Sequence, residues 1–160
     1  MTANRYAFLQ EKLNFPELNF KIVEEEGKLS IFDSLRKKYL ILTPEEWVRQ
    51  HMIAFLIQFR DYPKSLFSLE KGVQYNQLQK RFDILIRNRK GNPFLLMECK
   101  APNVLLSQKT VEQICVYNKS LNAQFLGITN GIKHLFLAFD KKTGNYVQIA
   151  DIPKFNCINK

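Results

Sequence analysis

The sequence has few cysteines and no long hydrophobic run. Three cysteines occur in 160 residues, and their odd number and irregular spacing do not fit the disulfide framework of a small secreted protein. The longest apolar stretch, residues 52–57, is far shorter than the 18 or more residues of a membrane-spanning helix. The first residues lead into no apolar signal core. We therefore expect a cytoplasmic protein with no membrane-spanning segment.

Acidic residues are scarce relative to basic ones. The 24 lysines and arginines outnumber the 15 aspartates and glutamates, which leaves a net charge of +9 and favours a polyanionic partner, with nucleic acid as the first candidate. No internal repeat, low-complexity tract or Pro/Gly/Ser-rich linker divides the chain. Hydrophobic residues make up 46%, which is typical of a folded chain. We expect one domain over residues 1–160.

Local patterns predict a sheet with helices packed against it. Residues 18–24 and 29–34 alternate like two strands joined near Gly27. Thr43, Pro44 and Glu46 form a helix start with a capping box, which predicts a helix over 44–60. Ser107 can cap a second helix over about 108–120. Further strands are predicted at 66–69, 82–87, 94–99, 124–129, 133–139 and 145–149. This order indicates an α/β or α+β sheet.

The predicted hairpin of the strands at 82–87 and 94–99 carries charges among apolar residues. Glu98 and Lys100 share one face because side chains alternate along a strand. If the hairpin is symmetric about Lys90-Gly91, Asp83 lies opposite Glu98, with their Cβ atoms about 4.5–5.5 Å apart. Two such carboxylates repel each other unless a cation joins them, and oxygen ligands suit Mg²⁺ or Mn²⁺. With Lys100 beside them, these residues predict phosphodiester hydrolysis by metal-activated water.

Two motifs resemble a known nuclease superfamily. Asp83 followed by Glu98-Cys99-Lys100 resembles the PD-(D/E)XK restriction-endonuclease-like nucleases. The run from Gln113 to Tyr117 resembles the Gln-x-x-x-Tyr element of the subfamily that includes RecB-like nucleases and type I restriction motor subunits. Residues 42–51, 70–72 and 128–131 are also similar to small bacterial proteins related to the amino-terminal nuclease domain of type I restriction R subunits. The resemblance covers about 30–153, so that 1–29 is an amino-terminal extension.

The resemblance implies a fold and a set of site residues. The fold would be a restriction-endonuclease-like αβββαβ core, with a mixed central sheet flanked by helices and extra amino-terminal strands. Asp83, Glu98 and the backbone carbonyl of Cys99 would bind Mg²⁺ or Mn²⁺. The implied catalytic residues are Asp83, Glu98, Lys100 and Gln113.

Two further roles follow from the same resemblance. The family often adds a glutamate from the first core helix, and Glu46 is the best match by position, although its capping role also explains it. Glu70 is the second candidate. Tyr117, one helical turn after Gln113, would contact the DNA backbone or support the metal site.

Basic residues near the hairpin are candidates for DNA binding. Lys80, Arg81, Arg87 and Arg89 could neutralise backbone phosphates without reading sequence. The alternative is a solvated surface, and Arg81 could instead pair with a site carboxylate. Arg36-Lys37-Lys38 forms another basic group, for which a solvated surface is the usual explanation.

Two function classes remain open. The first is a Mg²⁺-dependent deoxyribonuclease linked to restriction or DNA processing. The second is a non-catalytic DNA-binding or assembly module of a restriction or repair complex that retains the nuclease fold. The chain has no Walker A motif, since Gly127 and Gly131 are too close together and Ile132 follows them, so a motor or specificity function would come from partner subunits. RNA as a substrate and a homodimer also remain open.

Overall fold

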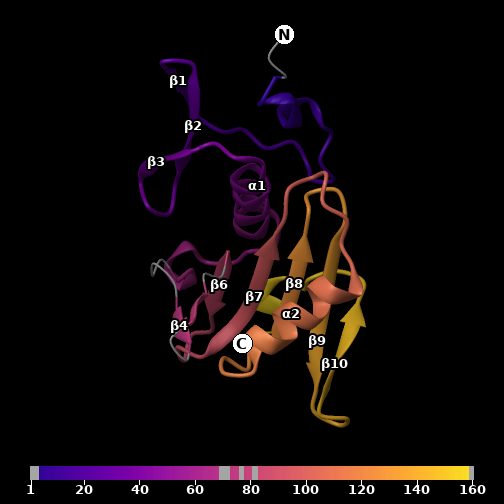
Figure 1. The fold of residues 1–160 in the computed structure, drawn as a ribbon. Coiled ribbons are helices and arrows are strands. Elements are labelled where there is room, and N and C mark those ends of the chain that lie inside the picture. The colour runs from indigo at the N-terminus through magenta and orange to yellow at the C-terminus, as the bar shows by residue number, and fades with distance from the viewer. Residues whose placement is uncertain (1–3, 69–72, 76–77, 81–82, 159–160) are drawn as a thin grey trace.

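A five-stranded mixed sheet lies at the centre of the structure, a computed structural model that describes residues 4–68, 73–75, 78–80 and 83–158 (Figure 1). Its strands follow the spatial order β10-β9-β8-β7-β6. Their bounds are β6 Ile84–Arg87, β7 Pro93–Cys99, β8 Phe125–Thr129, β9 His134–Asp140 and β10 Asn145–Ile149. Strands β7 and β8 are parallel, and helix α2 (Gln108–Asn118) connects them, as a parallel pair requires. The other neighbouring strands are antiparallel.

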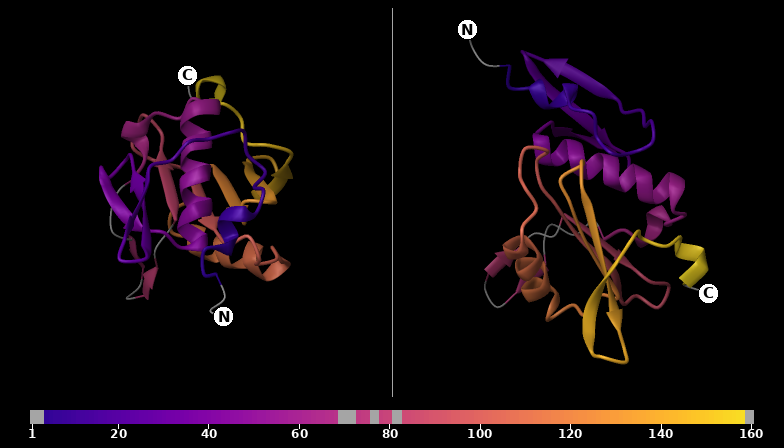
Figure 2. Two further views of the ribbon diagram at one scale, coloured as in Figure 1. Left: turned by 90° about the horizontal axis from the view of Figure 1, so that it is seen from above. Right: turned by 90° about the vertical axis from the view of Figure 1, so that its right-hand side faces the viewer.

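Helices α1 (Pro44–Phe59) and α2 pack on opposite faces of this sheet. Alternation along β7 explains the two cores, because Met97 packs in one cluster with Leu56 of α1, whereas Leu96 packs in the other with Ile114 of α2. The two helices are separated by the sheet in the side view of Figure 2. Among the described residues, no helix is long and apolar enough to cross a membrane.

The predicted helix starts are confirmed by their capping bonds. The Thr43 hydroxyl accepts a hydrogen bond from the Glu46 backbone at 3.1 Å, and Pro44 is the first helical residue. The Ser107 hydroxyl accepts from the Thr110 backbone at 3.4 Å. Helix α1 ends one residue and α2 two residues earlier than predicted.

A second sheet precedes α1 and lies beyond one end of the central sheet (Figure 1). Its strands β1 (Ile22–Glu25), β2 (Lys28–Asp33) and β3 (Lys38–Ile41) form an antiparallel meander. The first two match the predicted pair joined at Gly27. The third was not predicted, because it follows a turn at Lys37 whose left-handed φ of 54° has no glycine to mark it.

The predicted strand at 66–69 is wrong over its described part. A short 3₁₀ helix, η2 (Lys64–Leu66), occupies its start, and Phe67 then makes only an isolated bridge to Ile86. The remaining order α1, β6, β7, α2, β8 agrees with the expected αβββαβ core, in which this bridge takes the place of the first strand. The mixed sheet flanked by helices is the restriction-endonuclease-like α/β fold expected.

Four short elements complete the described chain, and none was predicted as a regular strand or α-helix. Strands β4 and β5 pair with each other in a separate two-stranded ribbon. The bounds are η1 Ala7–Gln10, β4 Val73–Tyr75, β5 Leu78–Lys80 and α3 Phe155–Ile158. Phe155 of α3 is completely buried against the central core, so the end of the described chain also belongs to the fold.

Candidate active site

The β6–β7 hairpin brings Asp83 and Glu98 to the same end of the sheet. Ile84 pairs with Met97 and Leu85 with Leu96, so the predicted register is confirmed up to the residues next to the two carboxylates. The register shifts only near the turn, between Ile86 and Arg87. The Asp83 carboxylate also accepts a hydrogen bond from the Cys99 backbone N–H at 2.7 Å, which fixes it against the end of β7.

Lys100 lies beside Glu98 as the alternation along β7 predicts. Its Nζ atom is 3.1 Å from Glu98 Oε1. The Lys100 side chain is 30% exposed and that of Glu98 19%, so the ammonium is accessible from solvent while the carboxylate is largely enclosed. The other oxygen, Glu98 Oε2, is buried and has no hydrogen-bond partner within the described part of the chain.

Burial shifts the acidity of Asp83. Loss of solvation raises the pKa of its carboxyl, and the nearby charge of Glu98 raises it further. The Cys99 N–H and the charges of Arg49 and Lys100 act in the opposite direction, and the resulting pKa is about 6. The site therefore holds Asp83, whose ionised form is disfavoured by burial, and Glu98, one oxygen of which has no hydrogen-bond partner among the described residues.

This pair of carboxylates fits a hard divalent cation. Buried carboxylate oxygens without enough hydrogen-bond donors are stabilised by a metal ion, and Glu98 Oε2 is such an atom. No group of three or more His, Cys, Asp or Glu side chains with metal-binding spacing occurs among the described residues. Two protein carboxylates agree with Mg²⁺, which is often held by one or two carboxylates together with water and substrate phosphate.

Glu46 is engaged within its own helix. Its Oε2 atom accepts hydrogen bonds from Arg49 Nη1 at 2.8 Å and Gln50 Nε2 at 3.0 Å. These bonds occupy one of the two carboxylate oxygens and hold the side chain against Arg49 and Gln50. Glu70, the second candidate, lies outside the described residues.

Arg49 is a site residue that the sequence did not reveal. Its Nε donates to the backbone carbonyl of Asp83 at 2.8 Å, and its Nη1 contacts Glu46 and, at 3.5 Å, Asp33 Oδ2. The spacing of three residues from Glu46 could have predicted that ion pair. The bond to Asp83 joins residues far apart in the chain and has no local signal.

Gln113 and Tyr117 lie on the side of the sheet that carries Glu98. Ile114 of α2 is buried in the cluster that contains Leu96, and Leu96 and Glu98 point to the same face of β7. Gln113 and Tyr117 are both partly exposed. Helix α2, which carries Gln113 and Tyr117, thus covers the face of the sheet to which Glu98 points.

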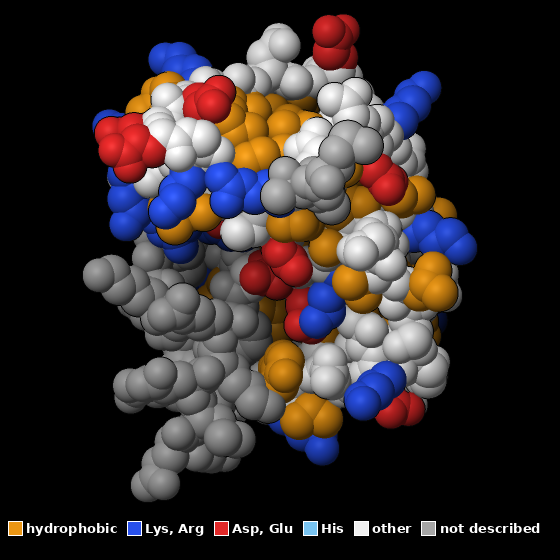
Figure 3. Space-filling model, turned by 45° about the horizontal axis from the view of Figure 1, so that its top comes forward, with side chains coloured by type: hydrophobic (Ala, Val, Ile, Leu, Met, Phe, Trp, Pro, Cys, Tyr) orange, Lys and Arg blue, Asp and Glu red, His pale blue; other side chains and the backbone are white. Residues whose placement is uncertain are grey.

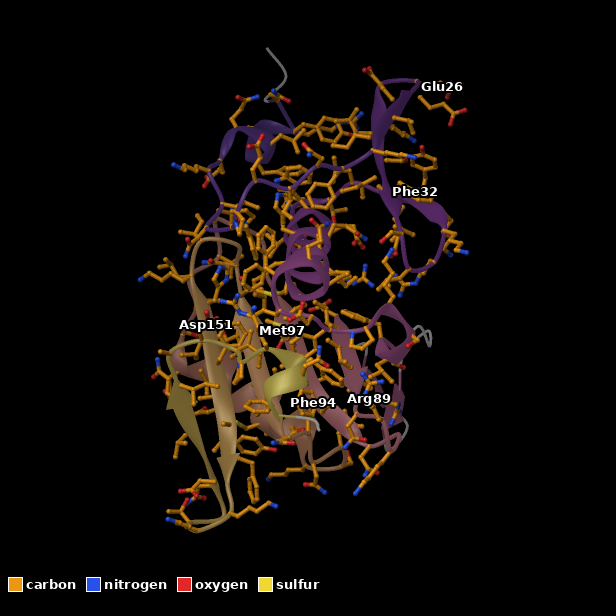
Figure 4. All side chains as sticks on the ribbon, turned by 180° about the vertical axis from the view of Figure 1, so that it is seen from behind. Glu26, Phe32, Arg89, Phe94, Met97 and Asp151 are labelled. Carbon is orange, nitrogen blue, oxygen red and sulfur yellow. The ribbon has the colours of Figure 1, made fainter. Side chains whose placement is uncertain are left out.

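The predicted DNA-binding arginines lie at the other end of the hairpin. Arg87 donates to the Gly91 carbonyl at 3.1 Å, and the Arg89 guanidinium lies 5.4 Å from the centre of the Phe155 ring. Arg87 is four residues from Asp83, or about 13 Å along the strand. Figure 4 shows Arg89 near Phe94, away from Met97. Arg81 and the side chain of Lys80 are outside the described part.

Acidic and basic side chains lie close together at the end of the hairpin that carries Asp83 and Glu98. Figure 3 shows a group of acidic side chains with a basic side chain beside it and a row of lysines and arginines along its border. In this region, ion pairs connect Lys100 to Glu98 and Arg49 to both Glu46 and Asp33. Alternating charges of this kind can bind a cation and a phosphate side by side.

Comparison with known proteins identifies the family. The family model described as type I restriction enzyme R protein N terminus matches residues 44–153. No curated protein matches the chain. Among solved structures, a fragment of a protein described as an HsdR subunit of a type I restriction enzyme from Vibrio vulnificus YJ016 is 27% identical, with a TM-score of 0.37. The match covers 56% of this chain and 17% of that chain. Because this family model matches residues 44–153, which is more than half of the chain, the chain belongs to the family of the type I restriction enzyme R protein N terminus.

Proposed function

We propose that this chain is a metal-dependent DNA nuclease domain that acts in restriction or DNA processing in the cytoplasm. The observation that carries the proposal is the juxtaposition of Asp83, Glu98 and Lys100, with an unpaired buried oxygen on Glu98. The net charge of +9 supports a polyanionic substrate. Family membership supports DNA rather than another polyanion.

Asp83 and Glu98 would hold Mg²⁺ or Mn²⁺, together with the Cys99 backbone carbonyl. When bound, the ion would lower the pKa of a water molecule and stabilise charge on the phosphate. The protein prepares this site by fixing Asp83 through the Cys99 N–H and through the Arg49 bond to its backbone carbonyl. The first contact restricts the carboxylate and the second the backbone of Asp83 before any ligand arrives, which reduces the entropy lost on binding.

Lys100 would stabilise charge on the reacting phosphate or orient the attacking water. Its ammonium is held at the site by Glu98, yet it is 30% exposed and can exchange that contact for one with substrate. Gln113 and Tyr117 would contact the DNA backbone from α2. Arg87 and Arg89, with Lys80 and Arg81, remain candidates for contacts further along the DNA, and partner subunits would supply a motor or sequence specificity.

A plasmid-nicking assay tests the proposal. We expect wild-type protein to convert supercoiled plasmid to open circles with Mg²⁺ or Mn²⁺ but not with EDTA. Lys100→Gln should lower the rate by about 100-fold or more, a loss typical of a group that stabilises transition-state charge. Lys142→Gln, an identical change in the exposed turn between β9 and β10, should keep the wild-type rate.

The second candidate is the non-catalytic module. It is favoured by the 3.1 Å ion pair through which Lys100 neutralises Glu98 without a metal. It predicts no cleavage of single-stranded, duplex or branched DNA with either metal, and DNA binding that needs no divalent ion and is unchanged in Lys100→Gln. That combination would contradict the nuclease proposal.

A further inference from the structure

A basic turn of the amino-terminal sheet is anchored directly to the proposed active site. The turn joins β2 to β3 and carries Arg36, Lys37 and Lys38, and it lies outside the part of the chain matched by the family model. The anchor is Asp33, the last residue of β2, whose side chain is completely buried. Its carboxylate contacts Arg49 Nη1 at 3.5 Å, and Arg49 in turn bonds the backbone carbonyl of Asp83.

The same aspartate makes the turn rigid. Asp33 Oδ1 accepts hydrogen bonds from the backbone N–H groups of Leu35 at 2.8 Å and Arg36 at 3.1 Å. Its Oδ2 atom pairs with the Arg36 guanidinium at 3.1 Å. Lys37 donates from its backbone to the Asp33 carbonyl at 2.8 Å. The basic side chains therefore project from a fixed backbone and not from a loose loop.

Lys37 and Lys38 are exposed and available for a ligand. Neither takes part in an ion pair within the part of the chain that the structure describes. The buried acid of the turn, Asp33, is already shared by two arginines. The exposed side of the turn thus carries two positive charges that no ion pair among the described residues neutralises.

Charged residues are distributed unequally between the two ends of β2 in the amino-terminal sheet. Its β1–β2 end carries three exposed glutamates at 24–26, whereas the β2–β3 end carries the three basic residues at 36–38. The six residues of β2 separate these ends by about 20 Å. Figure 4 places Glu26 at the outer tip of this sheet. Lys28 lies opposite Glu25 and Arg5 donates to the Gly27 carbonyl, so the β1–β2 end carries charges of both signs. The β2–β3 end is the one tied to the site by Arg49.

We propose that the β2–β3 turn is a phosphate-binding element that holds the DNA backbone next to the active site, an inference that rests on the proposed nuclease function. Lys37 and Lys38 neutralise phosphates of the bound strand, and the Asp33–Arg49 contact fixes their position relative to Asp83. The turn thereby supplies backbone contacts on the side of the site where Arg49 lies, while the arginines of the β6–β7 turn lie at the far end of the hairpin.

The salt dependence of DNA binding tests this proposal. The test variant is Lys37→Asn with Lys38→Gln, because asparagine tolerates the left-handed backbone at position 37. The matched control is Lys141→Asn with Lys142→Gln, which removes the same charge from the β9–β10 turn at the far end of the central sheet (Figure 1). Binding of a fluorescent DNA duplex is measured by anisotropy in EDTA at several salt concentrations.

We expect the slope of log affinity against log salt to fall by about 1 to 2 in the test variant, since each neutralised phosphate contributes roughly 0.9. The control should keep the wild-type slope. Equal slopes in the two variants, displacement of the labelled duplex by RNA in preference to unlabelled DNA, or no DNA binding by wild type would each overturn the proposal. If wild-type protein nicks DNA but the test variant keeps the wild-type slope, the β2–β3 turn does not bind phosphate, whereas the nuclease proposal stands. If the slope falls in the test variant but wild-type protein does not nick DNA, the β2–β3 turn binds phosphate and the nuclease proposal is wrong.

Discussion

Asp83 shows how a single residue of the site opposes the stability of the fold. Burial and the charge of Glu98 raise the pKa of this carboxyl from 3.8 to about 6, so the folded protein binds its proton more tightly than the unfolded chain does. Stability therefore increases as the pH falls from above 6 towards 4, and it decreases as the pH rises through 6. Near neutral pH the ionised carboxylate is a destabilising group that a bound cation would relieve.

Replacement of this carboxylate should stabilise the metal-free protein. Asp83→Asn retains an oxygen that can accept from the Cys99 N–H and removes the buried charge. We expect the free energy of unfolding to rise by roughly 1–3 kcal/mol at pH 7.5 and to change little at pH 4.5. Urea denaturation in EDTA at the two pH values measures the difference, with Glu17→Gln, which neutralises an exposed carboxylate, as the control. Parallel pH profiles for wild type and Asp83→Asn would contradict the argument.

The turn between β8 and β9 shows how one element joins three parts of the chain. Gly131 has a φ of 87°, and its carbonyl accepts from the backbone of Asn14 at 2.8 Å. A Cβ atom at this glycine would lie 3.0 Å from side-chain carbons of both Leu13 and Val48. The turn thus holds the amino-terminal segment and α1 against the end of the sheet, close to where β7 ends at Cys99.

Gly131→Ala should destabilise the protein more than a glycine substitution that only changes backbone freedom. The left-handed conformation costs an alanine about 1–2 kcal/mol, and crowding against Leu13 and Val48 should add roughly 1–3 kcal/mol. Gly144→Ala is the matched control, because its φ is 74° but no atom lies within 4 Å of the added carbon. Urea denaturation compares the two, and equal losses of stability would refute the packing role of Gly131.

At the scale of the whole molecule, local sequence patterns predicted most helices and strands but not the long-range contacts between them. The caps at Thr43 and Ser107 and the alternation around Glu98 and Lys100 are short-range patterns, and the two helix starts and the hairpin register followed from them. The contacts of Arg49 join α1 to β2 and to the start of β6, and no periodicity records such long-range bonds. Strand β3 was missed for a related reason, because its pairing depends on the buried carboxylate of Asp33 that shapes the preceding turn.

A metal ion that binds only the folded site should stabilise the entire domain. Such a ligand adds RT ln(1 + [L]/Kd), or about 2.7 kcal/mol at a concentration of 100 times Kd. For a domain of this size we expect the melting temperature to rise by roughly 5–10 °C on titration with Mn²⁺ and to return with EDTA. Asp83→Asn and Glu98→Gln should abolish the shift, whereas Asp61→Asn should keep it.

The pH dependence makes this measurement specific to the site. Protons compete with the cation for Asp83, whose pKa is about 6, so the Mn²⁺-induced shift should shrink as the pH is lowered from 7.5 to 5. Cation binding to scattered surface carboxylates would instead give similar shifts in wild type and in both site variants. That result would mean that Asp83 and Glu98 do not form a metal site in the free protein, and a repeat with bound duplex DNA would then decide whether substrate phosphate is needed to complete it.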